Sequence, residues 1–158
     1  MAGKVKPVPD GYHTLTPYIS IRGASDAIAF YKKAFGAEEL YRMDMPDGKL
    51  GHAELQIGDS RLMLADEFPD MPDAVAKSPR TLGGTTMGFN VYVPDVDARF
   101  QRAIDAGGKV KRAVQDQFYG DRSGTLEDPF GHIWTLSTHV EDLTPEQMKE
   151  RMAAMPQA

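Results

Sequence analysis

The feature that most constrains the fold of this chain is an order of predicted elements that occurs twice. In each half, a strand-like run of alternating apolar and polar residues is followed by an amphipathic helix and then by three more strand-like runs. The two halves are offset by about 70 residues and share this pattern rather than residue identity. The predicted strands are 12–21, 38–45, 49–57, 60–66, 85–93, 109–118, 121–126 and 132–139, and the predicted helices are 25–35 and 95–106. The repeat predicts two βαβββ modules.

Both helices have recognisable ends and apolar stripes. Ser25 is a residue type that caps helices, and Gly36 stands where the first helix should stop. Gly107 and Gly108 end the second helix in the same way. The predicted inward stripes are Ala27, Ile28, Tyr31, Ala34 and Phe35 in the first helix, and Val96, Phe100, Ala103 and Ile104 in the second.

The remaining segments read as connections and ends. Thr144 followed by Pro145 predicts the start of a short C-terminal helix over 145–154. Its methionines, at 148, 152 and 155, form an apolar edge that can pack on this subunit or on a partner. We divide the chain into an arm (1–11), a first module (12–66), a connector (67–84), a second module (85–140) and a C-terminal helix and tail (141–158).

Composition narrows the class of protein. The chain has 158 residues with 26% charged and 41% apolar residues, which is ordinary for one globular domain. Its formal net charge of −5 and its dispersed Lys and Arg residues argue against a nucleic-acid partner. It has no cysteine and no apolar run of the roughly 20 residues that span a bilayer. We therefore expect a cytoplasmic protein with no membrane partner.

Short motifs in both halves resemble one known family. They are Leu-Thr-Pro-Tyr-Ile-Ser at 15–20, Asp-Ala-Ile-Ala-Phe-Tyr at 26–31, Phe-Gly-Ala at 35–37, His-Ala-Glu-Leu at 52–55, Leu-Met-Leu-Ala-Asp at 62–66, Gly-Asp-Arg at 120–122 and Asp-Pro-Phe-Gly-His at 128–132. In this order they resemble the PhnB-like branch of the vicinal-oxygen-chelate superfamily, which includes glyoxalase I, bleomycin-resistance proteins and dioxygenases. The resemblance implies an α+β fold in which two βαβββ modules form curled mixed sheets around a cavity, with the helices outside. It does not imply one activity, because this fold hosts lyases, isomerases, dioxygenases and drug-sequestering proteins.

The resemblance also raises the question of a metal. Metal-using members hold a divalent ion with four side chains, usually His and Glu. The corresponding positions here are Thr16, Met63, Gly88 and Thr135. Because this set does not make a divalent-metal cage, we expect no cofactor. The alternative is a divalent metal on shifted ligands, His52 and Glu54 with His13 or Asp66, serving a lyase, an isomerase or a dioxygenase.

The tight turn at Gly58 and Asp59 fixes which side chains of the first module share a face, because it sets the hairpin register. One face holds the apolar residues that pack on the helix, and the other is polar. The polar face comprises His52, Glu54, Gln56, Arg61 and Met63. We interpret His52 as a candidate general base and Glu54 as the acid that orients it. Open alternatives are a solvent-exposed sheet surface, a structural histidine and a ligand contact.

The second half supplies further candidates. Asn90 and Tyr92 share a face, Tyr119 lies near the meeting point of two strands, and Arg122 can pair with an anionic group of a ligand. A local Asp121–Arg122 turn is the alternative role for the arginine. Trp134 should pack beneath the sheet and needs a partner for its indole N–H.

Together these residues predict a metal-independent small-molecule-binding protein or enzyme with a cup-shaped cavity. The predicted ligand contacts are Thr16, Tyr18, Met63, Asn90, Tyr92, Tyr119, Arg122 and Thr135, beside the candidate catalytic pair His52 and Glu54. Sequestration of a drug or metabolite is the non-enzymatic alternative, which an apolar, aromatic-lined cup would favour. The resemblance also implies a homodimer.

Overall fold

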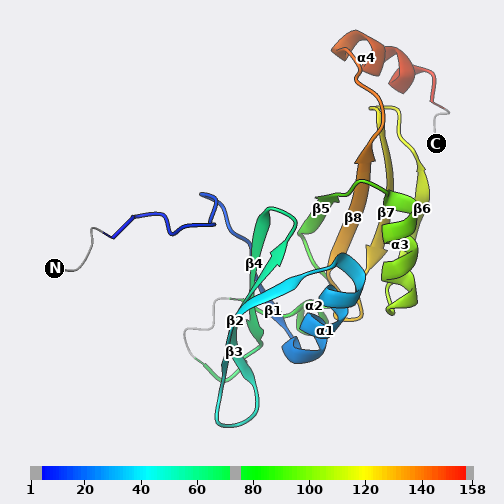
Figure 1. Ribbon diagram of the computed structural model, residues 1–158. Coiled ribbons are helices and arrows are strands. Elements are labelled where there is room, and N and C mark those ends of the chain that lie inside the picture. Colours follow the sequence, from blue (N-terminus) through cyan, green and yellow to red (C-terminus); the bar gives the residue numbers. More distant parts are fainter. Residues whose placement is uncertain (1–4, 72–75, 156–158) are drawn as a thin grey trace. The chain divides into compact units, whose positions relative to one another are not determined.

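The chain forms two compact units, each with its own sheet (Figure 1). The computed structural model describes residues 5–71 and 76–155, so the two ends of the chain and four residues of the predicted connector lie outside the described residues. Unit 1 is Met1–Gly84 and unit 2 is Thr85–Ala158.

Unit 1 is a mixed four-stranded sheet with a helix on one face. The strand order is β1-β4-β3-β2, in which β1 runs parallel to β4 and the other neighbours are antiparallel. Helix α1 packs on β1, β3 and β4 (Figure 1). The elements of unit 1 are β1 (Tyr18–Ile21), α1 (Ala24–Phe35), β2 (Glu38–Asp44), β3 (Leu50–Ile57), β4 (Ser60–Asp66) and α2 (Pro79–Leu82).

Unit 2 repeats this arrangement. Its strand order is β5-β8-β7-β6, with β5 parallel to β8, and helix α3 packs on β6, β7 and β8. Its elements are β5 (Gly88–Tyr92), α3 (Val96–Asp105), β6 (Lys109–Asp116), β7 (Asp121–Glu127), β8 (Ile133–His139) and α4 (Pro145–Ala153). The predicted α+β class and the duplication are therefore confirmed. Among the described residues, every helix is too short or too polar to cross a bilayer.

The core of unit 1 follows the predicted alternation along β3 and β4. The hairpin has the expected register, with Ile57 opposite Ser60 and Glu54 opposite Met63. The predicted stripe of α1 is buried. The strand side chains buried beneath that helix are Ala53, Leu55, Leu62 and Leu64. Because the helix takes this face, the opposite face of the sheet is left for polar groups and a cavity.

In unit 2 the core is organised around Trp134, which is buried as predicted. Its indole Nε1–H donates to Oδ2 of Asp128 at 2.9 Å, and its ring stacks on Phe89 with 4.4 Å between the ring centroids. The other oxygen of Asp128 accepts the backbone N–H groups of Phe130 and His132. One buried carboxylate thus accepts hydrogen bonds both from the backbone of the turn before β8 and from the indole.

Two predicted boundaries near the N-terminus are wrong. The first strand begins at Tyr18 rather than at residue 12, because Pro17 has no N–H to donate and joins the sheet only through its carbonyl, which accepts from Met63 N at 2.9 Å. Ser25 does not cap α1. The helix follows Gly23, whose φ is 84°, and a carboxylate oxygen of Asp66 accepts the N–H groups of Gly23 and Ala24.

The predicted connector contains structure of its own, the single helical turn α2. Ser78 caps this turn, and Glu67 holds it to the end of β4. The Glu67 carboxylate is 3% exposed and accepts from Ser78, Thr81 and Arg22. Burial opposes the ionisation of Glu67, but these hydrogen bonds outweigh it and lower its pKa from 4.5 to about 2.

The C-terminal helix α4 forms where it was predicted. Thr144 and Gln147 make a reciprocal capping box, with the Gln147 N–H donating to the Thr144 hydroxyl and the Thr144 N–H donating to the Gln147 side chain. No residue of this helix is buried. Helix α4 is therefore stabilised by local interactions such as this capping box rather than by packing in a core.

Candidate functional site

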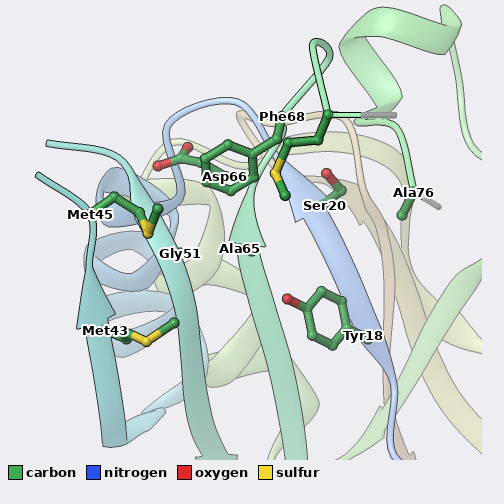
Figure 2. A pocket seen from close by; sticks show the side chains of 10 residues that line it. Tyr18, Ser20, Met43, Met45, Gly51, Ala65, Asp66, Phe68 and Ala76 are labelled. Carbon is green, nitrogen blue, oxygen red and sulfur yellow. The ribbon is translucent and has the colours of Figure 1, made fainter. Parts of the chain in front are cut away.

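The helix-free face of the unit 1 sheet carries a cavity of about 680 Å³ (Figure 2). Met43 on β2 and Met45 just beyond it face Tyr18 on β1 across the cavity, and Phe68 lies near one end (Figure 2). Most of the lining is apolar. The lining residues are Tyr18, Ser20, Met43, Met45, Gly51, Ala65, Asp66, Phe68, Met71 and Ala76.

The cavity exists because the middle of the sheet carries small residues there. Gly51 on β3 and Ala65 on β4 form its floor between the larger side chains (Figure 2). The pairing of β2 with β3 shifts by one residue between Met43–His52 and Asp44–Leu50, and such a bulge can turn neighbouring side chains toward one face. A Cβ at Gly51 would lie 2.9 Å from the Met45 sulfur, so a larger residue would fill the space.

Polar groups lie beside the cavity rather than inside it. The Tyr18 hydroxyl is 3.4 Å from His52 Nδ1, and His52 Nε2 is 3.4 Å from Glu54 Oε1. Burial raises the pKa of Tyr18, so its hydroxyl stays protonated at neutral pH. Tyr18 therefore both lines the cavity and contacts His52.

Glu54 is held by two residues that were not predicted as site residues. The Tyr12 hydroxyl donates to Glu54 Oε2, and Arg61 Nη1 donates to the same oxygen at 3.2 Å. The guanidinium of Arg61 also lies over the Tyr12 ring at 4.2 Å. The Tyr12 hydroxyl, then His52 and Arg61, lower the pKa of the Glu54 carboxyl against the effect of burial. Glu54 is therefore an ionised group that orients its neighbours rather than a proton donor.

A second polar cluster lies on unit 2. Asn90 is paired with Thr135 in the parallel ladder and accepts from Ser137 Oγ at 3.0 Å. The Tyr92 hydroxyl donates to Asp121 at 2.8 Å, and the other oxygen of Asp121 lies 2.8 Å from His139 Nδ1. The bond to Asp121 raises the pKa of Tyr92.

His139 is the charged end of this cluster. Its Nε2 lies 3.0 Å from Asp142, so the ring stands between two carboxylates. Asp142 first, and then Asp121, raise the pKa of His139, so the protonated ring persists to higher pH than that of an unpaired histidine.

The structure gathers some predicted ligand contacts and separates others. Met63 lies beside Tyr18 and Glu54 on the same face of unit 1. Thr16 precedes β1, and its hydroxyl donates to the backbone oxygen of His13 at 3.4 Å. Tyr119 lies in the β6–β7 turn, where its ring packs edge-on against Phe118.

Arg122 differs most from its predicted placement. It is paired with Thr138, which accepts the N–H of Val96 at the start of α3, so it faces the helix side of the sheet. Its Nε and Nη2 donate to both oxygens of Asp97 at 2.7 Å, and its Nη1 donates to Asp116 at 3.0 Å. The guanidinium donors that were predicted to bind an anionic ligand are therefore already bonded to protein carboxylates. They raise the pKa of Arg122, which in turn lowers that of Asp97.

The residues that the resemblance assigns to the family's metal positions do not fit a divalent ion. The structure pairs Met63 with Tyr18 and Thr135 with Asn90, which lie two residues beyond Thr16 and Gly88, and neither partner is a carboxylate or an imidazole. In the shifted alternative, Asp66 would be a ligand. One of its oxygens already accepts the N–H groups of Gly23 and Ala24, and the other accepts the Leu50 N–H at 2.7 Å. Within 5–71 and 76–155, no group of three or more acidic or histidine side chains is arranged to hold a metal.

Three comparisons with known proteins agree with this fold. Residues 13–136 match the Glyoxalase/Bleomycin resistance protein/Dioxygenase superfamily. The Mycobacterium bovis protein Mb0911c is 44% identical over 140 residues, covering 89% of this chain and 92% of the relative. The crystal structure of TioX from Micromonospora sp. ML1 has 25% identity and a TM-score of 0.62 over 81% of this chain and 99% of TioX. The PhnB protein from Bacillus cereus, at 18% identity, has the same fold with a TM-score of 0.62 over 80% of this chain and 99% of that protein.

The chain therefore belongs to the Glyoxalase/Bleomycin resistance protein/Dioxygenase superfamily, as the sequence resemblance predicted.

Proposed function

We propose that this protein binds a small, largely apolar molecule in the unit 1 cavity without the help of a divalent metal. The observation that carries the proposal is the cavity itself, whose volume of about 680 Å³ lies within the range of small-molecule sites. Its methionines are flexible and polarizable, so they can adapt to a flat or branched ligand. Tyr18 supplies a hydroxyl that can fix the orientation of one polar group on that ligand.

The cavity lining favours binding over turnover. Among the described residues that line it, Asp66 is the one ionisable carboxylate, and both of its oxygens accept backbone N–H groups. No acid and base converge on the space that a ligand would occupy in the described part of unit 1. The proposed function is therefore binding without turnover, as in the sequestration of a drug or metabolite.

A second candidate is an enzyme in which His52 moves a proton. The contacts of its ring with Tyr18 and with the ionised Glu54 support this function, because a base needs an orienting partner. In that case, replacing His52 by Gln should abolish turnover of a bound substrate and leave its binding nearly unchanged.

The proposed cavity can be tested with Nile red, a neutral dye whose fluorescence reports an apolar site. We expect one dye per chain, and Met43→Gln should raise the dissociation constant about tenfold, because an amide is then desolvated against the ligand. Dialysis against EDTA should leave the affinity unchanged. Met152→Gln on α4, where the side chain is 63% exposed, is the matched control. Equal affinities for the two variants, or loss of binding after EDTA, would overturn the proposal.

A homodimer and a cytoplasmic location belong to the same proposal. The homodimer rests on the family resemblance, and sedimentation equilibrium of the full chain tests it. The cytoplasmic location rests on the composition of the sequence.

A further inference from the structure

The face of the unit 2 sheet that points away from α3 is lined with hydroxyl groups. Ser123 is opposite Ser137, and Thr125 is opposite Thr135, with 2.9 Å between the two threonine oxygens. Both serines are buried, and both threonines are half-buried. We call these four residues the hydroxyl face. Each of these hydroxyls can both donate and accept a hydrogen bond.

One arginine projects onto the hydroxyl face. Arg112 on β6 donates from Nη2 to Ser123 Oγ at 3.0 Å and to Thr125 Oγ1 at 3.4 Å. Within the described residues these two hydroxyls are its hydrogen-bond partners, and no carboxylate forms an ion pair with it. Its Nε and Nη1 donors therefore have no protein acceptor there.

Two irregularities in the ladder turn Arg112 toward this face. Val110 is opposite Leu126 and Arg112 is opposite Thr125, so β6 carries one extra residue between them, and a second shift follows before Gln115. Without the first shift, Arg112 would be opposite Gly124. A Cβ at Gly124 would lie 2.8 Å from both Phe100 and Val114, so that face is tightly packed against α3. Bulges commonly re-aim side chains beside functional sites.

The other charges near Arg112 are already matched. Lys111 pairs with Glu127 at 3.0 Å, and Asp121 is engaged by Tyr92 and His139. Arg112 itself is half-buried, and its two hydrogen-bond partners among the described residues are neutral hydroxyls. A guanidinium with free N–H groups beside a hydroxyl donor is suited to binding the acceptor oxygens of an anion.

We propose that Arg112 and the hydroxyl face form a binding site for a small oxyanion, either a carboxylate or a phosphate. The guanidinium supplies the charge and its free Nε and Nη1 donors, and one hydroxyl of the hydrogen-bonded Thr125–Thr135 pair supplies a further donor. This site lies within unit 2, whereas the apolar cavity proposed above lies within unit 1.

The test is a titration of the full chain with inorganic phosphate and, separately, with acetate, followed by NMR of the arginine Nε–H signals. Chloride is adjusted to keep the ionic strength constant, because exposed charges are screened by salt. We expect the Arg112 signal to shift and saturate. The Arg112→Gln variant should weaken binding about tenfold or more, since it removes the charge-assisted hydrogen bonds.

Arg151→Gln is the matched control, because Arg151 lies on α4 and is already paired with Glu141. It should bind like the parent chain. Thr125→Val keeps the side-chain shape and provides a second variant should Arg112→Gln fail to fold; it should weaken binding several-fold. A response to phosphate alone or to acetate alone defines which oxyanion the site takes. Similar affinities in Arg112→Gln and Arg151→Gln, unaltered affinity in Thr125→Val, or no saturable shift with either anion would overturn the proposal.

Discussion

Glu67 shows at the scale of one residue how burial and hydrogen bonding compete. Its folded pKa of about 2 lies below its ordinary value of 4.5. Because the folded pKa is lowered, the stabilisation is fully present above pH 4.5 and is lost as the pH falls toward 2. The difference corresponds to about 3 kcal/mol of unfolding free energy.

We therefore predict that Glu67→Gln lowers the unfolding free energy at pH 6 and that this deficit shrinks as the pH falls from 5 toward 2. Urea unfolding of both proteins across that range measures the effect. Glu146→Gln, on the exposed helix α4, should track the parent chain at every pH. A deficit that does not change with pH would show that the substitution acts through packing and not through ionisation.

The candidate site could be predicted from sequence only where a short-range signal set the register. The turn at Gly58 placed His52, Glu54 and Met63 on one face, and the structure agrees. Arg112 could not be placed, because its face depends on two bulges that no residue pattern marks. The same holds for Phe68 and Met71, which reach the cavity from a segment without periodicity.

At the scale of elements, helix ends that depend on neighbouring residues could be predicted from sequence, and a helix start that depends on a distant residue could not. Gly36 ends α1 with φ 71°, and Thr144 caps α4, as predicted from neighbouring residues alone. The start of α1 was mispredicted because its partner is Asp66, whose carboxylate reaches the helix from 42 residues away. Such a partner has no signature within the helix sequence itself.

Helix α4 provides a direct test of local capping. Since it buries no residue, Thr144→Ala should remove about 1 kcal/mol from the helix while leaving global stability unchanged. Amide hydrogen exchange should show protection in α4 reduced about fivefold, with an unaltered urea midpoint for the whole chain. Thr144→Ser retains a capping hydroxyl and should behave like the parent. Loss of protection that extends into β7 and β8 would instead mean that the helix supports the sheet.

At the scale of the whole molecule, the two units share a topology but differ in the chemistry of their free sheet faces. Unit 1 presents methionines and aromatic rings around a cavity, whereas unit 2 presents hydroxyls and an arginine. The duplicated pattern in the sequence predicts the shared part, because the core of each unit needs the same alternation against its helix. The faces diverge because core packing does not constrain them.

The duplication also predicts how a destabilising substitution in one core should affect the other unit. Leu64 and Leu136 occupy matched positions, each fully buried on the central strand that pairs with the first strand of its unit. Truncation of either to Ala should cost about 2–5 kcal/mol, since it removes buried methyl groups and leaves a cavity. Helices α1 and α3 each pack on the sheet of their own unit. Under native conditions, Leu64→Ala should therefore speed amide exchange in β1, β3 and β4 while β5, β7 and β8 stay protected, and Leu136→Ala should do the reverse. Faster exchange in both sheets of either variant would mean that the two cores unfold as one cooperative structure.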